Sequence, residues 1–253
     1  MKMYDLIVIG AGVSGLAAAI SAKLEKSDIK VLVLEKQNKC GRKLSASGNG
    51  KCNVTNDVFN NSCYHSSERS FVSDFLNHHS KEEVIDFFNI CGIPLYDNNG
   101  YYYPLSNHAK QVTGKLVDLC KRLGVVILTD EEVISIENKI VSTTNNSYKA
   151  ANIIFACGSN AADRLGGSDS GYLLMKKLGI SMSMLYPGLT PIYVDDNKLK
   201  KAKGVRLNGT VSLHINESVI RESGQIQINE NNLSGIAIMN LSCYIPFYDC
   251  RSR

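Results

Sequence analysis

A strand, a glycine-rich turn, a helix and a second strand fill the first 35 residues, and this unit constrains the fold more than any other feature. Tyr4 to Ile9 is a short, β-branched apolar run, as is typical of a strand buried on both faces of a parallel sheet. The turn Gly10-Ala11-Gly12-Val13-Ser14-Gly15 follows at once, then a helix-forming run and a second apolar strand over residues 30–34. This order predicts the first βαβ unit of a doubly wound α/β fold.

Each glycine of the turn has a physical reason to be there. Gly10 allows the tight turn, Gly12 lets the backbone come close to a pyrophosphate, and Gly15 lets the helix pack against the strand. The amino end of the helix presents free N–H groups and its positive dipole end to phosphate. The predicted nucleotide contacts in this turn are Gly10, Ala11, Gly12, Ser14 and Gly15.

Glu35 ends the second strand, twenty residues beyond Gly15. A carboxylate at that place accepts hydrogen bonds from ribose hydroxyls and disfavours a 2′-phosphate, so the spacing favours FAD or NAD over NADP. Glu35 and the adjacent Lys36 are therefore candidate contacts in a Rossmann-like, dinucleotide-binding domain. The alternative is a glycine-rich turn in an ordinary helix and strand protein.

A second segment rich in glycine, hydroxyl, amide and cationic side chains spans residues 39–56. Its cations suit phosphate charge, its glycines allow close approach, and its amides offer hydrogen bonds to a planar, anionic ligand. A flexible surface loop is the alternative. The candidate contacts here are Gly41, Arg42, Lys43, Ser47, Gly48 and Asn53.

Three pieces of this segment closely resemble a long signature of the aminoacetone-oxidase-like flavoproteins, also called the BaiN or YhiN type. They are Gly41-Arg42-Lys43-Leu44, Ser47-Gly48-Asn49-Gly50 and Cys52-Asn53-Val54-Thr55-Asn56. Members of that family are FAD-dependent oxidoreductases in which this loop runs along the pyrophosphate and the flavin ring. The resemblance thus implies FAD as the cofactor, with NAD(P)H as a candidate co-substrate.

Further matches follow in the order of the family. Residues 153–158 look like the "ATG" strand end beside FAD, with Cys157 in place of Thr, and residues 167–172 resemble "GSTGDGY" with the acidic residue displaced. In the family the backbone at Val133 meets the adenine. The resemblance therefore adds Val133, Ala156 and Gly158 to the candidate cofactor contacts.

The remaining pattern predicts the domain organisation. Helices are expected over residues 70–76, 81–91 and 109–123, a strand over 125–128, and a hairpin through Asn145-Asn146 that returns to a strand over 153–156. Short alternating strands follow, with turns expected at Asn208-Gly209 and Ser223-Gly224. We therefore expect an FAD-binding Rossmann-like domain over 1–188, a partial inserted β domain over 189–242 and a divergent tail over 243–253. Since the family chains are longer, a C-terminal truncation is also expected.

Composition bounds the other classes of function. Hydrophobic residues make up 44% of the 253 residues and charged ones 21%, which suffices for a buried core. The net charge of +4 is too small to indicate a nucleic-acid partner or a membrane surface. The eight cysteines form no C-x-x-C pair, which favours reduced thiols, no metal site and a cytoplasmic location. The oligomeric state stays open.

The sequence thus predicts an FAD-dependent oxidoreductase that acts by flavin hydride transfer on a small metabolite. An amine or an unsaturated ring compound is the expected substrate, with NAD(P)H or O2 as co-substrate, and no residue is assigned an acid or base role. One alternative is a catalytically incompetent, truncated nucleotide-binding fragment of such an enzyme. Another is a flavin-dependent RNA-modifying protein, which the mild charge disfavours. For Cys52 and Cys157, packing is favoured over a redox disulfide.

Overall fold

The computed structural model describes residues 1–58, 60–66, 68–194, 197–215 and 217–246, and these residues belong to two compact units. The first unit consists of residues 1–63 and 68–182. The second consists of residues 64–67 together with the chain from residue 183 onward. The division after residue 182 falls before the predicted domain boundary at residue 188.

The main sheet of the first unit has the strand order β6-β2-β1-β9-β8-β7 among the described residues. β6, β2, β1 and β9 are parallel to one another, whereas β8 and β7 are antiparallel additions at one edge. This arrangement confirms the predicted doubly wound α/β fold. The strands are β1 (Lys2–Ile9), β2 (Val31–Leu34), β6 (Val126–Leu128), β7 (Val133–Glu137), β8 (Ile140–Thr143) and β9 (Ser147–Phe155).

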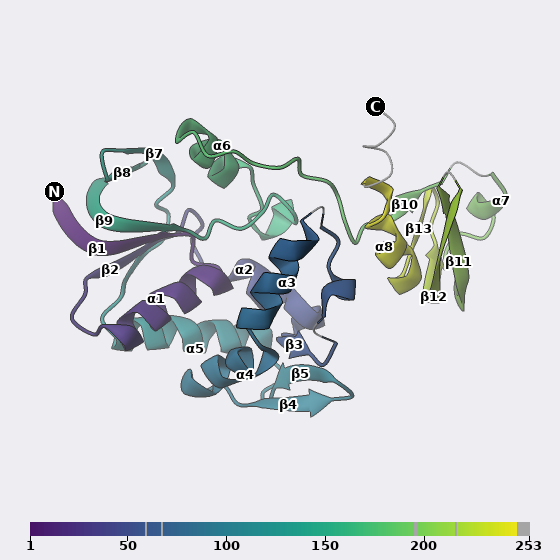
Figure 1. The fold of residues 1–253 in the computed structure, drawn as a ribbon, viewed down its shortest axis with the longest axis horizontal. Helices are drawn as coiled ribbons and strands as arrows, with labels where there is room; N and C mark the ends of the chain where they lie inside the picture. The colour runs from purple at the N-terminus through teal and green to yellow at the C-terminus, as the bar shows by residue number, and fades with distance from the viewer. Residues whose placement is uncertain (59, 67, 195–196, 216, 247–253) are drawn as a thin grey trace. The chain divides into compact units, whose positions relative to one another are not determined.

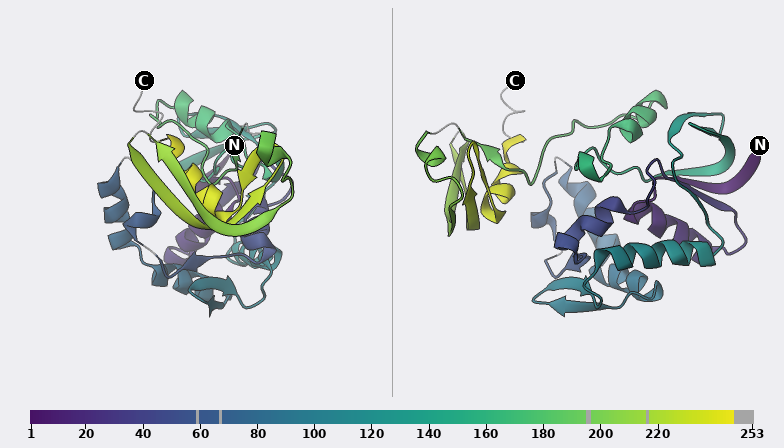
Figure 2. Two further views of the ribbon diagram at one scale, coloured as in Figure 1. Left: turned by 90° about the vertical axis from the view of Figure 1, so that its right-hand side faces the viewer. Right: turned by 180° about the vertical axis from the view of Figure 1, so that it is seen from behind.

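The central strands are apolar because helices and hairpin strands cover both faces of the sheet. All four residues of β2 are buried, as are the last four of β1. On one face α1 (Val13–Glu25) and α5 (Ala109–Arg122) lie side by side, as Figures 1 and 2 show. On the other face α6 (Ser170–Lys177) contributes Leu174 to a second apolar cluster with Ile7 and Leu34.

A smaller antiparallel sheet and the remaining helices complete the first unit. The predicted helices over 70–76, 81–91 and 109–123 are confirmed as α3, α4 and α5, within two residues at each end. The small sheet has the order β3-β5-β4. These elements are α2 (Arg42–Ala46), β3 (Thr55–Asn56), α3 (Arg69–His78), α4 (Lys81–Ile90), β4 (Leu95–Asn98) and β5 (Tyr101–Pro104), with short 3₁₀ turns at Ser47–Gly50, Asn61–Cys63 and Asp163–Leu165.

The predicted hairpin before β9 was incomplete, because the chain turns twice in this region. A first turn at Asn138 and Lys139, both with positive φ, joins β7 to β8, and only the second turn contains Asn145-Asn146. β9 is also longer than expected, since it begins at Ser147. The strand that was not predicted, β8, carries both polar and apolar residues, so the sequence gave no strong hydrophobic signal for it.

The second unit is an antiparallel sheet with the order β10-β13-β12-β11, with α8 against one face. The long, twisted β11–β12 hairpin is seen in the left view of Figure 2. The elements are β10 (Ile192–Tyr193), α7 (Asn197–Lys200), β11 (Arg206–Ile215), β12 (Ser218–Ile228), β13 (Asn232–Ser234) and α8 (Ile236–Ser242).

Both turns predicted in this unit were wrong. Asn208-Gly209 and Ser223-Gly224 lie in the middle of β11 and β12, where Gly209 pairs with Gly224. A Cβ on Gly224 would lie 3.7 Å from the Ala237 backbone nitrogen, so this glycine lies directly beneath α8. Gly224 therefore lies within a paired strand that faces α8, and the chain does not reverse there.

No helix among the described residues is long and apolar enough to cross a membrane. No group of three or more His, Cys, Asp or Glu side chains in the same residues is arranged to hold a metal ion.

Candidate functional site

Three parallel strands end together at one edge of the main sheet. Ile9 of β1 pairs with Leu34 of β2 on one side and with Phe155 of β9 on the other. The chain stays joined just beyond these ends, because Gly10 N–H donates to Leu34 O at 2.7 Å and Ala156 N–H donates to Ile9 O at 2.8 Å. The carboxyl ends of parallel strands are where ligands bind in doubly wound folds.

The three glycines of the turn have different surroundings. Gly10 has φ +105°, and a Cβ there would lie 2.4 Å from Ala156 O; a Cβ on Gly15 would lie 1.9 Å from Gly10 O. Both glycines are thus required by packing of the chain on itself. A Cβ on Gly12 would meet no described atom within 4 Å. Since Gly12 is also the N-cap of α1, it faces open space where the free helix N–H groups begin.

Glu35 links the end of β2 to the glycine turn. Its Oε2 accepts a hydrogen bond from Ala11 N–H at 2.8 Å, and its Oε1 accepts one from Gln37 N–H at 2.9 Å. These two hydrogen bonds hold the half-buried carboxylate in a fixed orientation beside the turn. A carboxylate has about four acceptor positions, so both oxygens can still accept from ribose hydroxyls.

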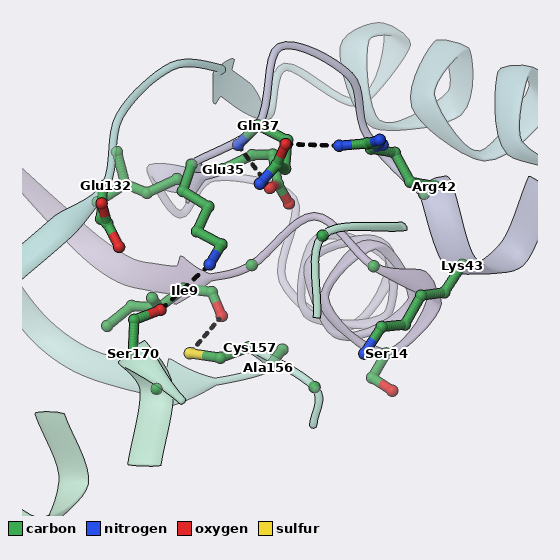
Figure 3. Close-up of a pocket in the computed structure, with 18 of the residues that line it drawn as sticks. Ile9, Ser14, Glu35, Gln37, Arg42, Lys43, Glu132, Ala156, Cys157 and Ser170 are labelled. Carbon is green, nitrogen blue, oxygen red and sulfur yellow. Dashed lines mark hydrogen bonds between the residues drawn. The ribbon is translucent and has the colours of Figure 1, made fainter. Parts of the chain in front are cut away.

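A cavity of about 200 Å³ occupies this edge of the sheet, and Figure 3 shows its walls. Among the predicted contacts, eleven line it: Gly10, Gly12, Ser14, Glu35, Lys36, Gly41, Arg42, Lys43, Val133, Ala156 and Gly158. The structure therefore brings together residues from the glycine turn, the second motif, β7 and the end of β9. Ala11 and Gly15 lie beneath the turn, buried, and do not line the cavity.

The cations predicted to meet phosphate are held by protein groups. Arg42 donates to Gln37 Oε1 at 2.6 Å and to Arg164 O at 2.8 Å, while Lys43 Nζ donates to Ser159 O at 2.6 Å. Arg42 and Lys43 lie on one side of the cavity in Figure 3, across from Glu132. The guanidinium group of Arg42 and the ammonium group of Lys43 therefore hold the chain at Arg164 and Ser159 in place, and they give this side of the cavity positive charge.

The loop after α2 lies outside this cavity, so Ser47, Gly48 and Asn53 stay predicted contacts without a common pocket. Gly48 and Asn49 adopt left-handed φ angles of +55° and +54°. A Cβ on Gly48 would lie 2.4 Å from Asn53 N, and Ser47 Oγ donates to Leu44 O at 2.7 Å. In the structure these residues shape the loop itself.

Sequence reasoning missed several residues that line the cavity. Gln37 receives the Arg42 hydrogen bond, Glu132 lies just before β7, and Ser170 begins α6. A signal for Ser170 was present, because it lies in the 167–172 segment that resembles a family motif. Gln37 and Glu132 had no signal of their own, although each is next in the chain to a predicted contact, Lys36 and Val133 respectively.

The thiols of Cys52 and Cys157 are shielded rather than activated. Burial raises the pKa of the Cys157 thiol, which lines the cavity, and the pKa of the Cys52 thiol, which is 1% exposed. The seven cysteines of the described residues are all free thiols. Raised pKa values mean little thiolate at neutral pH, so these two thiols are poor nucleophiles.

Comparison with known proteins identifies the family. The HI0933-like protein Rossmann domain matches residues 4–240, which is nearly the whole chain. The chain belongs to the HI0933-like family. This family includes FAD-binding oxidoreductases of the BaiN and YhiN type, so the resemblance drawn from residues 41–56 is confirmed.

Curated relatives of this HI0933-like protein carry two kinds of name. A 3-dehydro-bile acid delta(4,6)-reductase from Clostridium scindens is 33% identical over 248 residues, which are 96% of this chain and 61% of the relative. A ribosomal RNA dihydrouridine synthase from Escherichia coli is 27% identical over 251 residues, 96% of this chain and 62% of the relative. The chain thus spans about three fifths of the length of these relatives.

Solved structures share the fold of this HI0933-like protein. One is the 3-ketosteroid-delta4-(5alpha)-dehydrogenase from Rhodococcus jostii RHA1 in complex with 4-androstene-3,17-dione, with a TM-score of 0.55 and 15% identity. The match covers 82% of this chain and 60% of that one. At this level of identity the likeness supports the fold alone.

Proposed function

We propose that the chain binds FAD at the edge where β1, β2 and β9 end, as part of an oxidoreductase. The observation that carries the proposal is the arrangement of Gly12 and Glu35. Gly12 faces open space at the amino end of α1, and Glu35 presents a fixed carboxylate beside it. Pyrophosphate fits the first group and ribose the second.

The residues present fit a dinucleotide with an unmodified ribose. A 2′-phosphate beside Glu35 would place two anionic groups together. The site therefore favours FAD over a nucleotide whose ribose carries a 2′-phosphate. The cavity of about 200 Å³ is smaller than the roughly 300–1,000 Å³ of complete small-molecule sites. It therefore suits the nucleotide end of FAD, with the remainder extending beyond it.

For the substrate we propose a carbon–carbon double bond conjugated to a carbonyl group. The names of the two kinds of relative share this chemistry: a 3-oxo steroid with 4,6 double bonds, and a uridine ring that becomes saturated. A bound flavin supplies hydride transfer to or from such a substrate. An unsaturated ring is thus the better supported of the two expected substrate classes, and NAD(P)H is proposed as the source of electrons.

The roles of the chain's own side chains are confined to binding and orientation. Glu35 holds the turn and offers acceptors to ribose, and Gly12 leaves room for phosphate. Val133 and Leu174 line the apolar part of the cavity, where a flat base can lie. These residues would fix the cofactor without taking part in proton transfer.

The test is to purify the chain, add FAD, remove the excess and record the visible spectrum. We expect the absorbance to show about one bound FAD per protein chain. No retained flavin would mean that the chain by itself is not an FAD-binding unit. If flavin is retained, anaerobic reduction by NADH and by NADPH, followed by a panel of cyclic enones, tests the substrate class.

A nucleic-acid substrate is the second candidate, because a ribosomal RNA dihydrouridine synthase from Haemophilus influenzae is also 28% identical over 256 residues. In the second unit, one face of the β11–β12 hairpin exposes Arg206, Asn208, Arg221 and Gln225. Such a face suits phosphate and base edges. Reduction of uridine in an RNA oligonucleotide, with no reduction of cyclic enones, would select this candidate.

A further inference from the structure

The segment of residues 158–170, here called the strap, forms one wall of the proposed FAD cavity. Gly158, Leu165, Gly166 and Ser170 of the strap line that cavity. Three cations donate to the strap. Lys36, in the loop after β2, donates to the hydroxyls of Ser168 and Ser170, whereas Arg42 and Lys43, the first two residues of α2, donate to Arg164 O and Ser159 O. The cavity wall is thus held at three points from the opposite side.

The Lys36 contact is different from the other two because it ends on side chains. Lys36 Nζ donates to Ser168 Oγ and lies 3.3 Å from Ser170 Oγ, and the two hydroxyls are 2.9 Å apart. Ser170 N–H also donates to Ser168 Oγ, with 3.4 Å between the nitrogen and the oxygen. All three residues are half-buried. The group joins the end of β2 to the first turn of α6.

The chemistry of this group favours positioning over direct binding. An ammonium has three donors, and in the structure two of them are directed to neutral hydroxyls of the strap. Ser170 is also the first residue of α6, so the contact fixes where that helix starts. Removing either partner breaks the same one of the three contacts that hold this wall of the cavity.

We propose that Lys36 is a positioning residue that acts through Ser168 and Ser170, latching the strap over the bound nucleotide and setting how slowly the nucleotide leaves. The proposal rests on the FAD site proposed above. It assigns Ser168 and Ser170 a role in cofactor retention. It also separates Lys36 from residues such as Glu35 that offer groups to the cofactor itself.

The first measurement needs no cofactor. Arg164 is exposed in the strap, so trypsin cleavage of the Arg164–Leu165 bond reports strap opening. Four proteins are compared with the wild type: Lys36→Met, the double variant Ser168→Ala with Ser170→Ala, the triple combination, and Lys39→Met. Lys39 lines the same cavity, and its side chain makes no hydrogen bond or ion pair within the described ranges.

If the latch exists, the first three variants are cleaved about five- to tenfold faster, and all three to the same extent, because they break one contact. Lys39→Met stays at the wild-type rate. Unchanged cleavage in the serine variant overturns the proposal. Ser168→Thr with Ser170→Thr keeps both hydroxyls and should restore the slow rate.

The second measurement is the rate at which FAD leaves, followed by flavin fluorescence. The same three variants should release FAD about five- to tenfold faster with an unchanged association rate. Faster release in Lys36→Met alone, with the serine variant normal, would make Lys36 a direct ligand and overturn the latch. If the wild type binds no FAD, the proposed function fails, and the cleavage rates still decide whether the latch exists.

Discussion

The carboxylate of Glu35 accepts a hydrogen bond at 2.8 Å from the backbone N–H of Ala11, so the end of β2 is tied directly to the turn that follows β1. A second bond from Gln37 N–H fixes the other oxygen. The same carboxylate therefore stabilises the turn and faces the proposed ribose. The two roles are separable only by comparing variants.

Glu35→Ala removes both the charged acceptor and the bond to the turn. Hydrogen bonds to charged groups contribute about 1.5–3 kcal/mol, so FAD affinity should fall by about tenfold or more. Isothermal titration with FAD measures this. Glu132→Ala is the control, because Glu132 lines the same cavity but its carboxylate takes no hydrogen bond from the described residues. An equal loss in both variants would point to net charge instead of ribose binding.

Gly12 and Gly15 should respond to substitution in opposite ways. Gly12→Val places a side chain where the pyrophosphate is proposed, in space that the described residues leave open. FAD binding should therefore be abolished while the unfolding temperature stays near that of the wild type. Gly12 has φ −72°, which valine adopts without strain.

Gly15→Ala should instead damage the fold. Its Cβ would lie 1.9 Å from Gly10 O, so α1 must move away from the turn. Forced overpacking of this kind typically costs about 1–3 kcal/mol. Urea denaturation followed by circular dichroism measures the loss.

Retained FAD affinity in Gly12→Val would mean that the pyrophosphate lies elsewhere.

The first βαβ unit was predictable because its signals are local. Gly10, Gly12 and Gly15 each answer a requirement set by the strand before them or the helix after them. The turn at Asn208-Gly209 failed for the opposite reason. The dipeptide is typical of a hairpin turn in isolation, but its place in β11 depends on pairing with a strand that begins ten residues later.

The candidate site was predictable to the extent that it follows the strand ends. Glu35 was found in this way, whereas Ala156 and Val133 came from the family resemblance. The partners of Arg42 and Lys43 were not predictable, because Arg164 O and Ser159 O lie more than 110 residues away in the chain. Carbonyl groups carry no sequence signal, so only the fold shows that these cations bind the strap.

The buried thiols should resist alkylation. Burial raises the pKa of Cys91 to about 11 and that of Cys120 to about 12, so at pH 8 less than about 1% of either is thiolate. Among the cysteines of the described residues, Cys63 is the exposed one and should react first with iodoacetamide, as followed by mass spectrometry. Cys91 and Cys120 should react only after denaturant is added. Equal rates for Cys63 and Cys120 in the native protein would contradict the burial of Cys120.

Gly235 should be the most sensitive glycine of the second unit. It caps the amino end of α8 with φ +100° and ψ 166°, a region that is essentially restricted to glycine. A Cβ there would also lie 2.3 Å from Gln225 O of β12. Gly235→Ala therefore combines backbone strain with a steric overlap, and we expect a loss of at least about 3 kcal/mol.

Gly204→Ala is the matched control, because Gly204 has a similar φ of +92° and its Cβ would meet no described atom within 4 Å. Strain alone should cost about 1–2 kcal/mol there. The hydrogen-exchange rates of peptides from β12 and α8 measure the loss of stability that each variant causes in the second unit. If the two variants accelerate exchange equally, the overlap with Gln225 O is relieved by local movement, and α8 does not depend on glycine for its approach to β12.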